Sequence, residues 1–202
     1  MEINPNNLSS QEIYKILIGT VLPRPIAWVS TVDKSGNINL APFSFFTVAS
    51  VNPPIVCFCP LLKENSTAKD TLVNIKQTRE FVINIVSYDL AQTMNRTSAP
   101  YPSEVNEFAA AGVAAKQSKF VKPPCVADSR VNFECKLQQI IPLGSGPMAG
   151  NLVLGKVCNI HIHPDIFRNG QVDHQSLDAI GRMGGNMYAT IRDCFEMERP
   201  EI

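Results

Sequence analysis

The chain has 202 residues, which is enough for one domain with a substantial core that needs no disulfides. Hydrophobic residues make up 45% and charged residues 18%, so disorder is excluded as the main state. Lys plus Arg and Asp plus Glu both number 18, and this balance argues against a protein that binds nucleic acid or an anionic membrane.

The sequence has no feature of a secreted or membrane-spanning protein. No run approaches the roughly 20 apolar residues that cross a bilayer, and no basic region followed by an apolar run opens the chain. Six cysteines are scattered without a CxxC pair, which is typical of reduced, buried thiols. We therefore expect a cytoplasmic protein.

The first third of the chain predicts one helix followed by strands. Ser9 and Glu12 form a capping box, which predicts an N-terminal helix over about residues 9–20. Residues 26–32 are β-branched and aromatic, and Asp33–Gly36 is a typical hairpin turn. The return strand, a strand over Phe43–Val51 and a strand over Ile55–Cys59 complete this region.

The rest of the chain alternates short helices and strands. Helices are expected over Thr67–Thr78 and Asp89–Asn95, with a buried strand over Phe81–Val86 between them. Residues 97–124 are rich in Pro, Ala, Ser and Lys and are interpreted as a lid-like excursion within a single domain that spans residues 1–202. Further strands are expected over 130–141, over 152–163 and within 181–200.

Strands outnumber helices and mostly follow one another through short turns. This pattern favours a mainly β fold with flanking helices, and it favours an antiparallel barrel over a βαβ sheet.

One segment at an expected helix start has the composition of a phosphate site. Unpaired amides at a helix N-terminus carry partial positive charge, and two hydroxyls with one lysine lie beside them. The residues are Ser66, Thr67, Lys69, Asp70 and Thr71. A plain capping box between Thr67 and Asp70 is the alternative that the sequence leaves open.

A second segment has the composition of a binding wall for a flat ring. Alternation along a strand puts hydroxyls and aromatic rings on the same side, where apolar groups can cover a heteroaromatic ligand and backbone groups can meet its polar edge. The residues are Ser44, Phe45, Phe46, Thr47, Val48, Ala49 and Ser50. The alternative is an ordinary barrel strand whose serines fill small gaps.

Metal and hydrolytic sites are not favoured. His161 and His163 face the same way on a strand near Cys158, but a third ligand at useful spacing is missing, so no metal site is assigned. The chain has three histidines and no Gly-x-Ser-x-Gly elbow, which argues against a catalytic triad.

Read in order, several motifs resemble the flavin reductase-like family, in particular the nitrilotriacetate monooxygenase component B and flavoredoxin-like branch. The resemblance covers residues from about 3 to 200 and depends on the order and spacing of the motifs together. They are Pro23–Thr31, Asn39–Phe46, Asn52–Pro54, Lys69–Leu72, Phe81–Ile85, Ile141–Gly144, Leu154–Val157 and Gly181–Tyr188.

The resemblance implies an FMN-binding split β-barrel of Greek-key type that works as a homodimer, with FAD as the less favoured flavin. By position, Ser44 to Ser50 would line the flavin ring, and the segment from Ser66 to Thr71 would hold the phosphate. Arg24 and Trp28 would lie near the flavin, and Asn151, Arg182 and Tyr188 on the side of the substrate or nicotinamide. An oxygenase or another redox protein would be the partner.

One position departs from the family pattern and leaves two functions open. Flavin reductases that use NADH commonly carry histidine where this chain has Asn151, and an amide cannot carry a proton or a positive charge. The main expectation is an oxidoreductase that transfers electrons from NADH or NADPH to the flavin. The alternative is an FMN-binding electron carrier that another redox protein reduces, and a third possibility is a barrel that binds no flavin.

Overall fold

The computed structural model describes residues 1–201. In chain order the helices, including three short 3₁₀ turns, are η1 (Pro5–Asn7), α1 (Ser10–Thr20), α2 (Asp70–Thr78), η2 (Tyr88–Leu90), α3 (Ala91–Arg96), α4 (Glu107–Ala111), η3 (Pro164–Ile166) and α5 (His174–Leu177). The strands are β1 (Arg24–Pro25), β2 (Ala27–Val32), β3 (Ile38–Phe43), β4 (Phe46–Ser50), β5 (Ile55–Phe58), β6 (Glu80–Ile85), β7 (Ala115–Lys116), β8 (Cys125–Val126), β9 (Val131–Pro142), β10 (Asn151–Ile162), β11 (Phe167–Arg168), β12 (Gln171–Val172), β13 (Ile180–Arg182) and β14 (Tyr188–Thr190).

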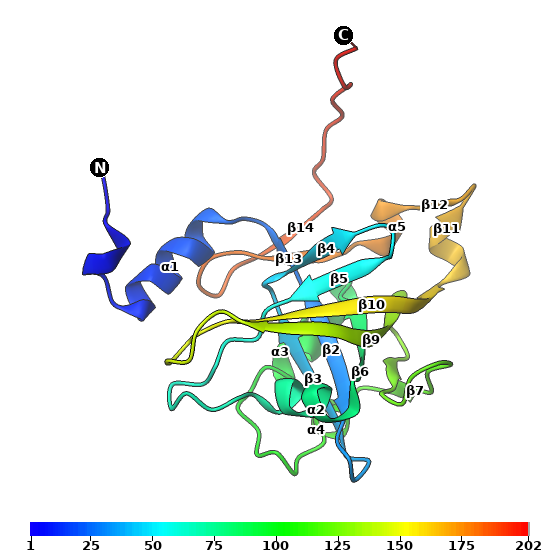
Figure 1. Cartoon of the computed structure of the whole chain (residues 1–202). Coiled ribbons are helices and arrows are strands. Elements are labelled where there is room, and N and C mark those ends of the chain that lie inside the picture. The colour runs from blue at the N-terminus through cyan, green and yellow to red at the C-terminus, as the bar shows by residue number, and fades with distance from the viewer. Residues whose placement is uncertain (202) are drawn as a thin grey trace.

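Seven strands form one curved antiparallel sheet, in the order β3-β2-β6-β9-β10-β5-β4 (Figure 1). Every pairing within this sheet is antiparallel, and the hairpin of β9 and β10 is its longest part. A smaller sheet of β1, β13 and β14 lies beside it. The expected mainly β, antiparallel fold with flanking helices is therefore confirmed.

At strand β2 both faces of the sheet are covered. All six of its residues are buried, and they alternate between two cores. Val29 packs with Phe58, Phe81 and the apolar face of α2, whereas Trp28 packs on the other face with Met94 and neighbouring residues from α3 and α4. Because successive side chains of a strand point to opposite faces, a strand that is buried on both sides reads as continuously apolar.

Two local predictions near the N-terminus are confirmed. The Ser9 backbone N–H donates to Glu12 at 2.9 Å, and the Glu12 N–H donates back to the Ser9 hydroxyl at 3.3 Å, so the capping box forms. Gly36 has a φ of +93°, which closes the hairpin between β2 and β3 at the expected turn. Helix α1 extends away from the sheet at one end of the molecule (Figure 1).

The predicted single strand over residues 43–51 is wrong, because the chain bends at Ser44 and Phe45. Strand β3 ends at Phe43, and β4 begins at Phe46 on the opposite edge of the sheet. The bend breaks the alternation that was expected along this run, so the seven residues do not share one wall. Sequence periodicity cannot reveal such a break, since both halves are apolar and β-forming.

The 97–124 segment packs against the sheet over much of its length. Phe108 of α4 and Val126 of the following strand β8 join the core around Trp28, and Val121 packs with Val82 and Cys125. Helix α4 is also anchored by a buried carboxylate of its own, Glu107. None of the helices in residues 1–201 is both long and apolar enough to cross a membrane.

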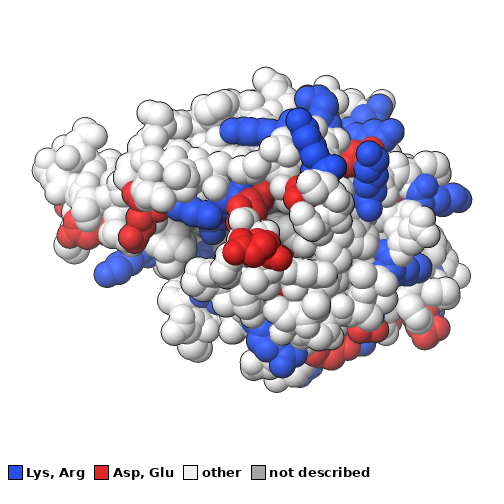
Figure 2. All heavy atoms as spheres, turned by 90° about the horizontal axis from the view of Figure 1, so that it is seen from below, with Lys and Arg blue, Asp and Glu red and all other residues white. Residues whose placement is uncertain are grey.

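Charged side chains of both signs share the face seen in Figure 2, which turns the molecule to show it from below. The net charge of the chain is zero, and this face is neither uniformly basic nor uniformly acidic. An anionic ligand would have to be attracted by local groups.

Candidate functional site

The first turn of α2 offers free backbone amides. The helix begins at Asp70, its N-cap is Lys69, and no side-chain oxygen among residues 1–201 caps it. The predicted capping box does not form, because the Thr67 amide and hydroxyl both donate to Asn65 Oδ1, at 3.1 and 2.6 Å. The predicted start at Thr67 is thus three residues too early. Uncapped amides at a helix start are suited to an anion.

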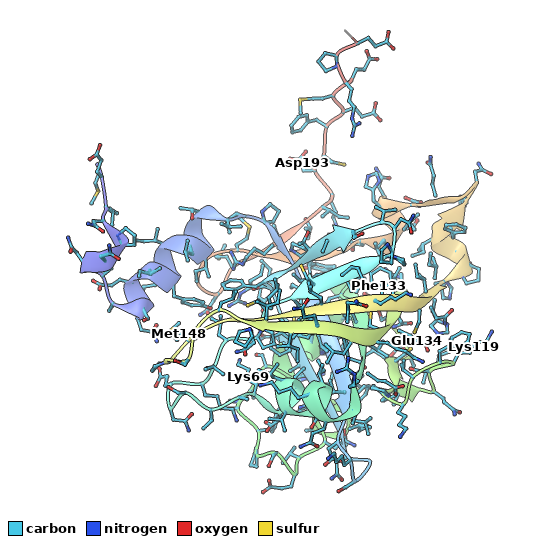
Figure 3. All side chains as sticks on the ribbon, viewed as in Figure 1. Lys69, Lys119, Phe133, Glu134, Met148 and Asp193 are labelled. Atoms are coloured by element: carbon cyan, nitrogen blue, oxygen red, sulfur yellow. The ribbon has the colours of Figure 1, made fainter. Side chains whose placement is uncertain are left out.

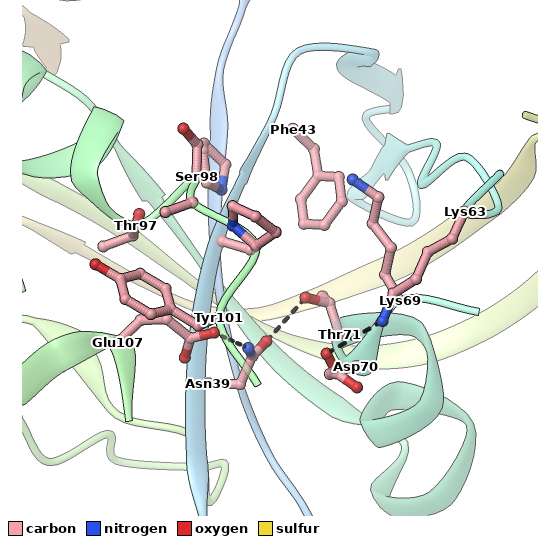
Figure 4. A pocket seen from close by; sticks show the side chains of 14 residues that line it. Asn39, Phe43, Lys63, Lys69, Asp70, Thr71, Thr97, Ser98, Tyr101 and Glu107 are labelled. Carbon is pink, nitrogen blue, oxygen red and sulfur yellow. Dashed lines mark hydrogen bonds and ion pairs between the residues drawn. The ribbon is translucent and has the colours of Figure 1, made fainter. Parts of the chain in front are cut away.

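A cavity of about 370 Å³ opens at this helix start (Figure 4). Lys63 and Lys69 border it on one side, and the chain from Thr97 to Tyr101 borders it on the other. Lys63 is paired with Asp70 at 3.8 Å, whereas Lys69 has no carboxylate partner among the described residues. The side chain of Lys69 is still exposed, but desolvation by nearby protein and the Lys63 ammonium lower its pKa. A bound anion would compensate this charge.

Thr71 supports the cavity wall but does not offer its proton to a ligand. The side chain is 1% exposed, and its hydroxyl donates to Asn39 Oδ1 at 2.9 Å. The Asn39 amide in turn donates to Glu107 Oε1 at 2.7 Å, and the Leu40 backbone N–H donates to Glu107 Oε2 at 3.1 Å (Figure 4). This chain of bonds joins α4, β3 and the first turn of α2. Glu107 was not among the residues predicted from the sequence, because its Ala-rich surroundings give no signal.

The predicted phosphate residues therefore divide into two groups. Lys69, Asp70 and Thr71 line the cavity. Ser66 and Thr67 precede it in an exposed loop, where Ser66 has a φ of 62°. These two residues do not line the cavity, although they shape the turn that leads into α2.

The segment predicted as a ring-binding wall is also divided, by the bend after β3. Two further cavities, of about 240 and 140 Å³, share Pro42 and Phe43 with the first. Ser44 lines both of them, and Phe45 lines only the smaller one. Phe46 packs against the core. Thr47, Val48 and Ala49 are exposed on β4, an edge strand, and together with Ser50 at its end they line none of these three cavities.

Arg24 and Trp28 are both buried, with their polar groups engaged by protein. Arg24 donates to the carbonyls of Ile18, Val21 and Met183, at 2.7 to 2.9 Å, which ties α1 to the turn after β13. Burial lowers its pKa. Trp28 is 0% exposed and donates its indole N–H to Thr97 Oγ1 at 2.9 Å. Trp28 lines none of the three cavities, whereas Arg24 reaches their wall by a long 3.4 Å contact to Ser44 Oγ.

Residues expected on the substrate side lie in two places. Arg182 and Tyr188 line the 240 Å³ cavity, with the guanidinium carbon 4.5 Å from the centre of the Tyr188 ring. Asn151 starts β10 and is 4% exposed. Its Nδ2 is the one buried side-chain nitrogen or oxygen without a hydrogen-bond partner in residues 1–201.

A separate cluster surrounds Glu134, far from Lys69 in Figure 3. His161 Nε2 lies 2.5 Å from Glu134 Oε1, and Cys125 is the third member of the cluster. The sequence spacing indicated no third ligand for His161, so this grouping emerges only from the fold. Both carboxylate oxygens already accept backbone or side-chain N–H groups, which is typical of a structural carboxylate whose hydrogen bonds are satisfied.

Comparisons with known proteins agree with this architecture. The sequence model of the flavin reductase like domain matches residues 18–178. An uncharacterised protein of Halalkalibacterium halodurans is 38% identical over 204 residues, which covers 100% of this chain and 98% of that protein. Nitrilotriacetate monooxygenase component B from Bacillus cereus is 32% identical, with a TM-score of 0.93 and coverage of 98% of both chains.

Two more distant structures show the fold alone. A Shewanella frigidimarina protein described as having a split barrel domain is 22% identical, with a TM-score of 0.84 and coverage of 99% of this chain and 100% of that one. Flavoredoxin of Desulfovibrio vulgaris is 18% identical, with a TM-score of 0.75 and coverage of 88% and 91%. The split-barrel expectation is thereby confirmed. With a family match over most of its length and the same fold as these structures, the chain belongs to the flavin reductase like family.

Proposed function

We propose that this protein binds FMN and transfers electrons to it from NADH or NADPH. The observation that carries the proposal is the uncapped start of α2 beside Lys69, which has no carboxylate partner in residues 1–201. The cavity there adjoins a second one at the bend of Ser44 and Phe45, and Lys69 lines both. A phosphate needs amide donors and a cation, and a flat ring needs an apolar wall with backbone groups. FMN combines these two parts, and FAD would need further room for its adenosine.

The residues fit a flavin in the following roles. Lys69 and the amides of Asp70 and Thr71 would hold the phosphate, while Ser66 and Thr67 shape the preceding turn. Ser44 and Phe45 would contact the ring, and Phe46 supports them from the core. Arg24 holds the wall of the site, and Arg182, Tyr188 and Asn151 would lie on the side where the redox partner approaches. The bound flavin would supply the hydride chemistry, and the protein would supply orientation and electrostatics.

A homodimer is part of the proposal, because apolar side chains are exposed on β4 and on α1. Val48 of β4 is 63% exposed and Leu17 of α1 is 49% exposed. An apolar surface of this kind is typical of an interface. A second copy on β4 would bring Thr47, Val48, Ala49 and Ser50 next to the flavin ring, as the resemblance implies. Size-exclusion chromatography with light scattering tests the dimer, and a monomer mass would contradict it.

The proposed electron donor is open to one alternative. Asn151 has no imidazole and its amide is buried, which favours a carrier that receives electrons from another redox protein. The downstream partner would be an oxygenase or another electron acceptor, in the cytoplasm where the cysteines stay reduced. Stopped-flow bleaching of bound FMN by NADH or NADPH decides between the two. Bleaching supports the reductase, and reduction by dithionite alone supports the carrier.

The phosphate site is tested by charge reversal at two lysines of the same cavity. Lys69→Glu should raise the Kd for FMN by about 10- to 100-fold, since it removes a charge-assisted contact and adds repulsion. Lys63→Glu should have a smaller effect because Lys63 is already paired with Asp70. Lys76, exposed in the last turn of α2, serves as the control. Fluorescence titration measures all three, and equal losses at Lys63 and Lys69 would indicate diffuse electrostatics.

A further inference from the structure

The 240 Å³ cavity has a cationic wall without any acidic residue. It is lined by Tyr14, Ile26, Pro42, Phe43, Ser44, Met94, Asn95, Ser98, Arg182 and Tyr188. Ile26 and Met94 are buried and give it an apolar floor, and two tyrosines and one phenylalanine contribute rings. At 240 Å³ the cavity lies below the range of about 300–1,000 Å³ that is usual for drug-sized ligands, so it suits a ligand of one ring.

The cation of this cavity lacks a counter-charge. Arg182 makes no salt bridge within residues 1–201, and its one hydrogen bond goes to the Gly185 carbonyl at 2.6 Å. A guanidinium has five N–H donors, so the others are available to a ligand. Its neighbour Arg24 is also without a carboxylate, and the Arg182 charge contributes to the lowered pKa of Arg24. The two guanidinium groups therefore lie close enough to repel each other, and neither has a carboxylate partner in residues 1–201.

A second arginine–tyrosine pair in the same molecule shows the features of a purely structural pair. Arg192 lies over the Tyr88 ring at 4.4 Å, almost the same distance as in the Arg182–Tyr188 pair. Arg192, however, donates to both carboxylate oxygens of Asp178, at 2.9 and 2.7 Å, and this neutralises it. The two pairs share the distance between guanidinium and ring, and they differ in whether a carboxylate neutralises the arginine. Arg182 is the one that has no carboxylate partner among the described residues and that lines a cavity.

We propose that this cavity binds a planar, one-ring aromatic carboxylate, with the carboxylate on Arg182 and the ring against Tyr188 and the apolar floor. The guanidinium fork matches a carboxylate with two parallel N–H donors, and the stacked tyrosine fixes the plane of the fork. The site is separate from the phosphate site at Lys69, which lies in the neighbouring cavity. If a flavin is bound next to this cavity, the ligand would occupy the substrate side of the flavin. That role alone rests on the proposed function.

The test compares three probes by calorimetry on the purified full-length protein. Benzoate carries both the ring and the charge, benzamide keeps the ring, and cyclohexanecarboxylate keeps the charge without planarity. We expect benzoate to bind at least about tenfold more tightly than either of the others. Equal binding of benzamide would overturn the role of charge, and equal binding of cyclohexanecarboxylate would overturn the role of the planar ring.

Variants assign the binding to Arg182. Arg182→Gln should weaken benzoate binding by about tenfold or more, and Arg182→Lys should recover part of it, because charge returns without the fork. Arg192→Gln is the matched control and should leave benzoate binding unchanged. Equal losses at Arg182 and Arg192, or a loss on Lys69→Glu with none on Arg182→Gln, would overturn the proposal. Tyr188→Leu keeps the test valid if Arg182→Gln does not fold, since it removes the stacking partner and leaves the charge.

An FMN titration separates this inference from the proposed function. Arg182→Gln should weaken FMN binding far less than Lys69→Glu does, and FMN should not displace benzoate. Displacement by FMN would overturn the separate site, because the cavity would then belong to the flavin. If the wild type binds benzoate through Arg182 but does not bind FMN, the proposed function fails and the carboxylate site stands.

Discussion

Glu107 and Glu134 are both buried carboxylates, but the surroundings of the two side chains differ. Glu134 is 0% exposed and accepts hydrogen bonds from the backbone of Lys119 and Phe120 and from Asn159, with His161 beside it. Burial alone would raise its pKa, but these hydrogen bonds outweigh burial and lower the pKa to about 2. Glu134 therefore stays ionised and fastens the 119–120 loop to the sheet.

Glu107 keeps a less favourable charge beside the candidate site. It is 7% exposed and accepts two hydrogen bonds, from Asn39 and from the Leu40 backbone, without any cationic partner in the described chain. Burial raises its pKa, and the charge of Asp70 adds to this effect. A carboxylate with raised pKa on the wall of a cavity is typical of functional sites, whereas a fully satisfied one is typical of structural sites. The comparison separates a carboxylate that stabilises the molecule from one that borders the proposed binding site.

The largest expected effect is on stability, at Glu134. Glu134→Ala leaves two backbone amides and the Asn159 amide without their acceptor, so we expect the free energy of unfolding to fall by about 3–5 kcal/mol. Urea denaturation measures this loss. The Kd for FMN of the folded variant should not change, because Glu134 lies far from the cavity (Figure 3). A loss of flavin affinity at unchanged stability would contradict the structural role.

A smaller loss of stability, coupled to binding, is expected at Glu107. Both of its oxygens accept hydrogen bonds, so the amide of Glu107→Gln places a donor against a donor, at a cost of about 1–3 kcal/mol. The first turn of α2 then loses its support through Asn39, and the Kd for FMN should rise. Glu104→Gln, an exposed acid on the same segment, is the control. Full flavin affinity in Glu107→Gln would show that the chain of bonds does not position the site.

The smallest effect is a difference in how stability depends on pH. The lowered pKa of Glu134 contributes stability that is present above its ordinary pKa of 4.5 and is lost as the pH falls toward about 2. The gap between wild type and Glu134→Gln should therefore shrink over this range. For Glu107 the raised pKa gives the opposite dependence on pH, because protonation relieves an unfavourable buried charge. The wild type should therefore become more stable relative to Glu107→Gln as the pH falls. Urea denaturation at several pH values measures both gaps, and gaps that move in the same direction would contradict the comparison.

Local sequence signals predicted the elements that depend on neighbouring residues. The capping box at Ser9, the turn at Gly36 and the long strands β9 and β10 follow from short-range chemistry, and each lies close to where the pattern placed it. The position of the proposed phosphate-binding segment beside a helix start was predicted for the same reason. The exact start of α2 was not, because Asn65 competes for Thr67 and removes it from the cap.

What the sequence by itself determined is the class of fold, the β-rich order of elements and the family to which the chain belongs, because periodicity and motif order are properties of the chain. Only the tertiary structure decided that Thr71 faces Asn39, that Trp28 is core and that Glu107 borders the cavity. It also decided that Arg182 lacks the carboxylate that Arg192 has. These outcomes depend on which distant residues meet, since burial and charge compensation arise from contacts that no local pattern encodes.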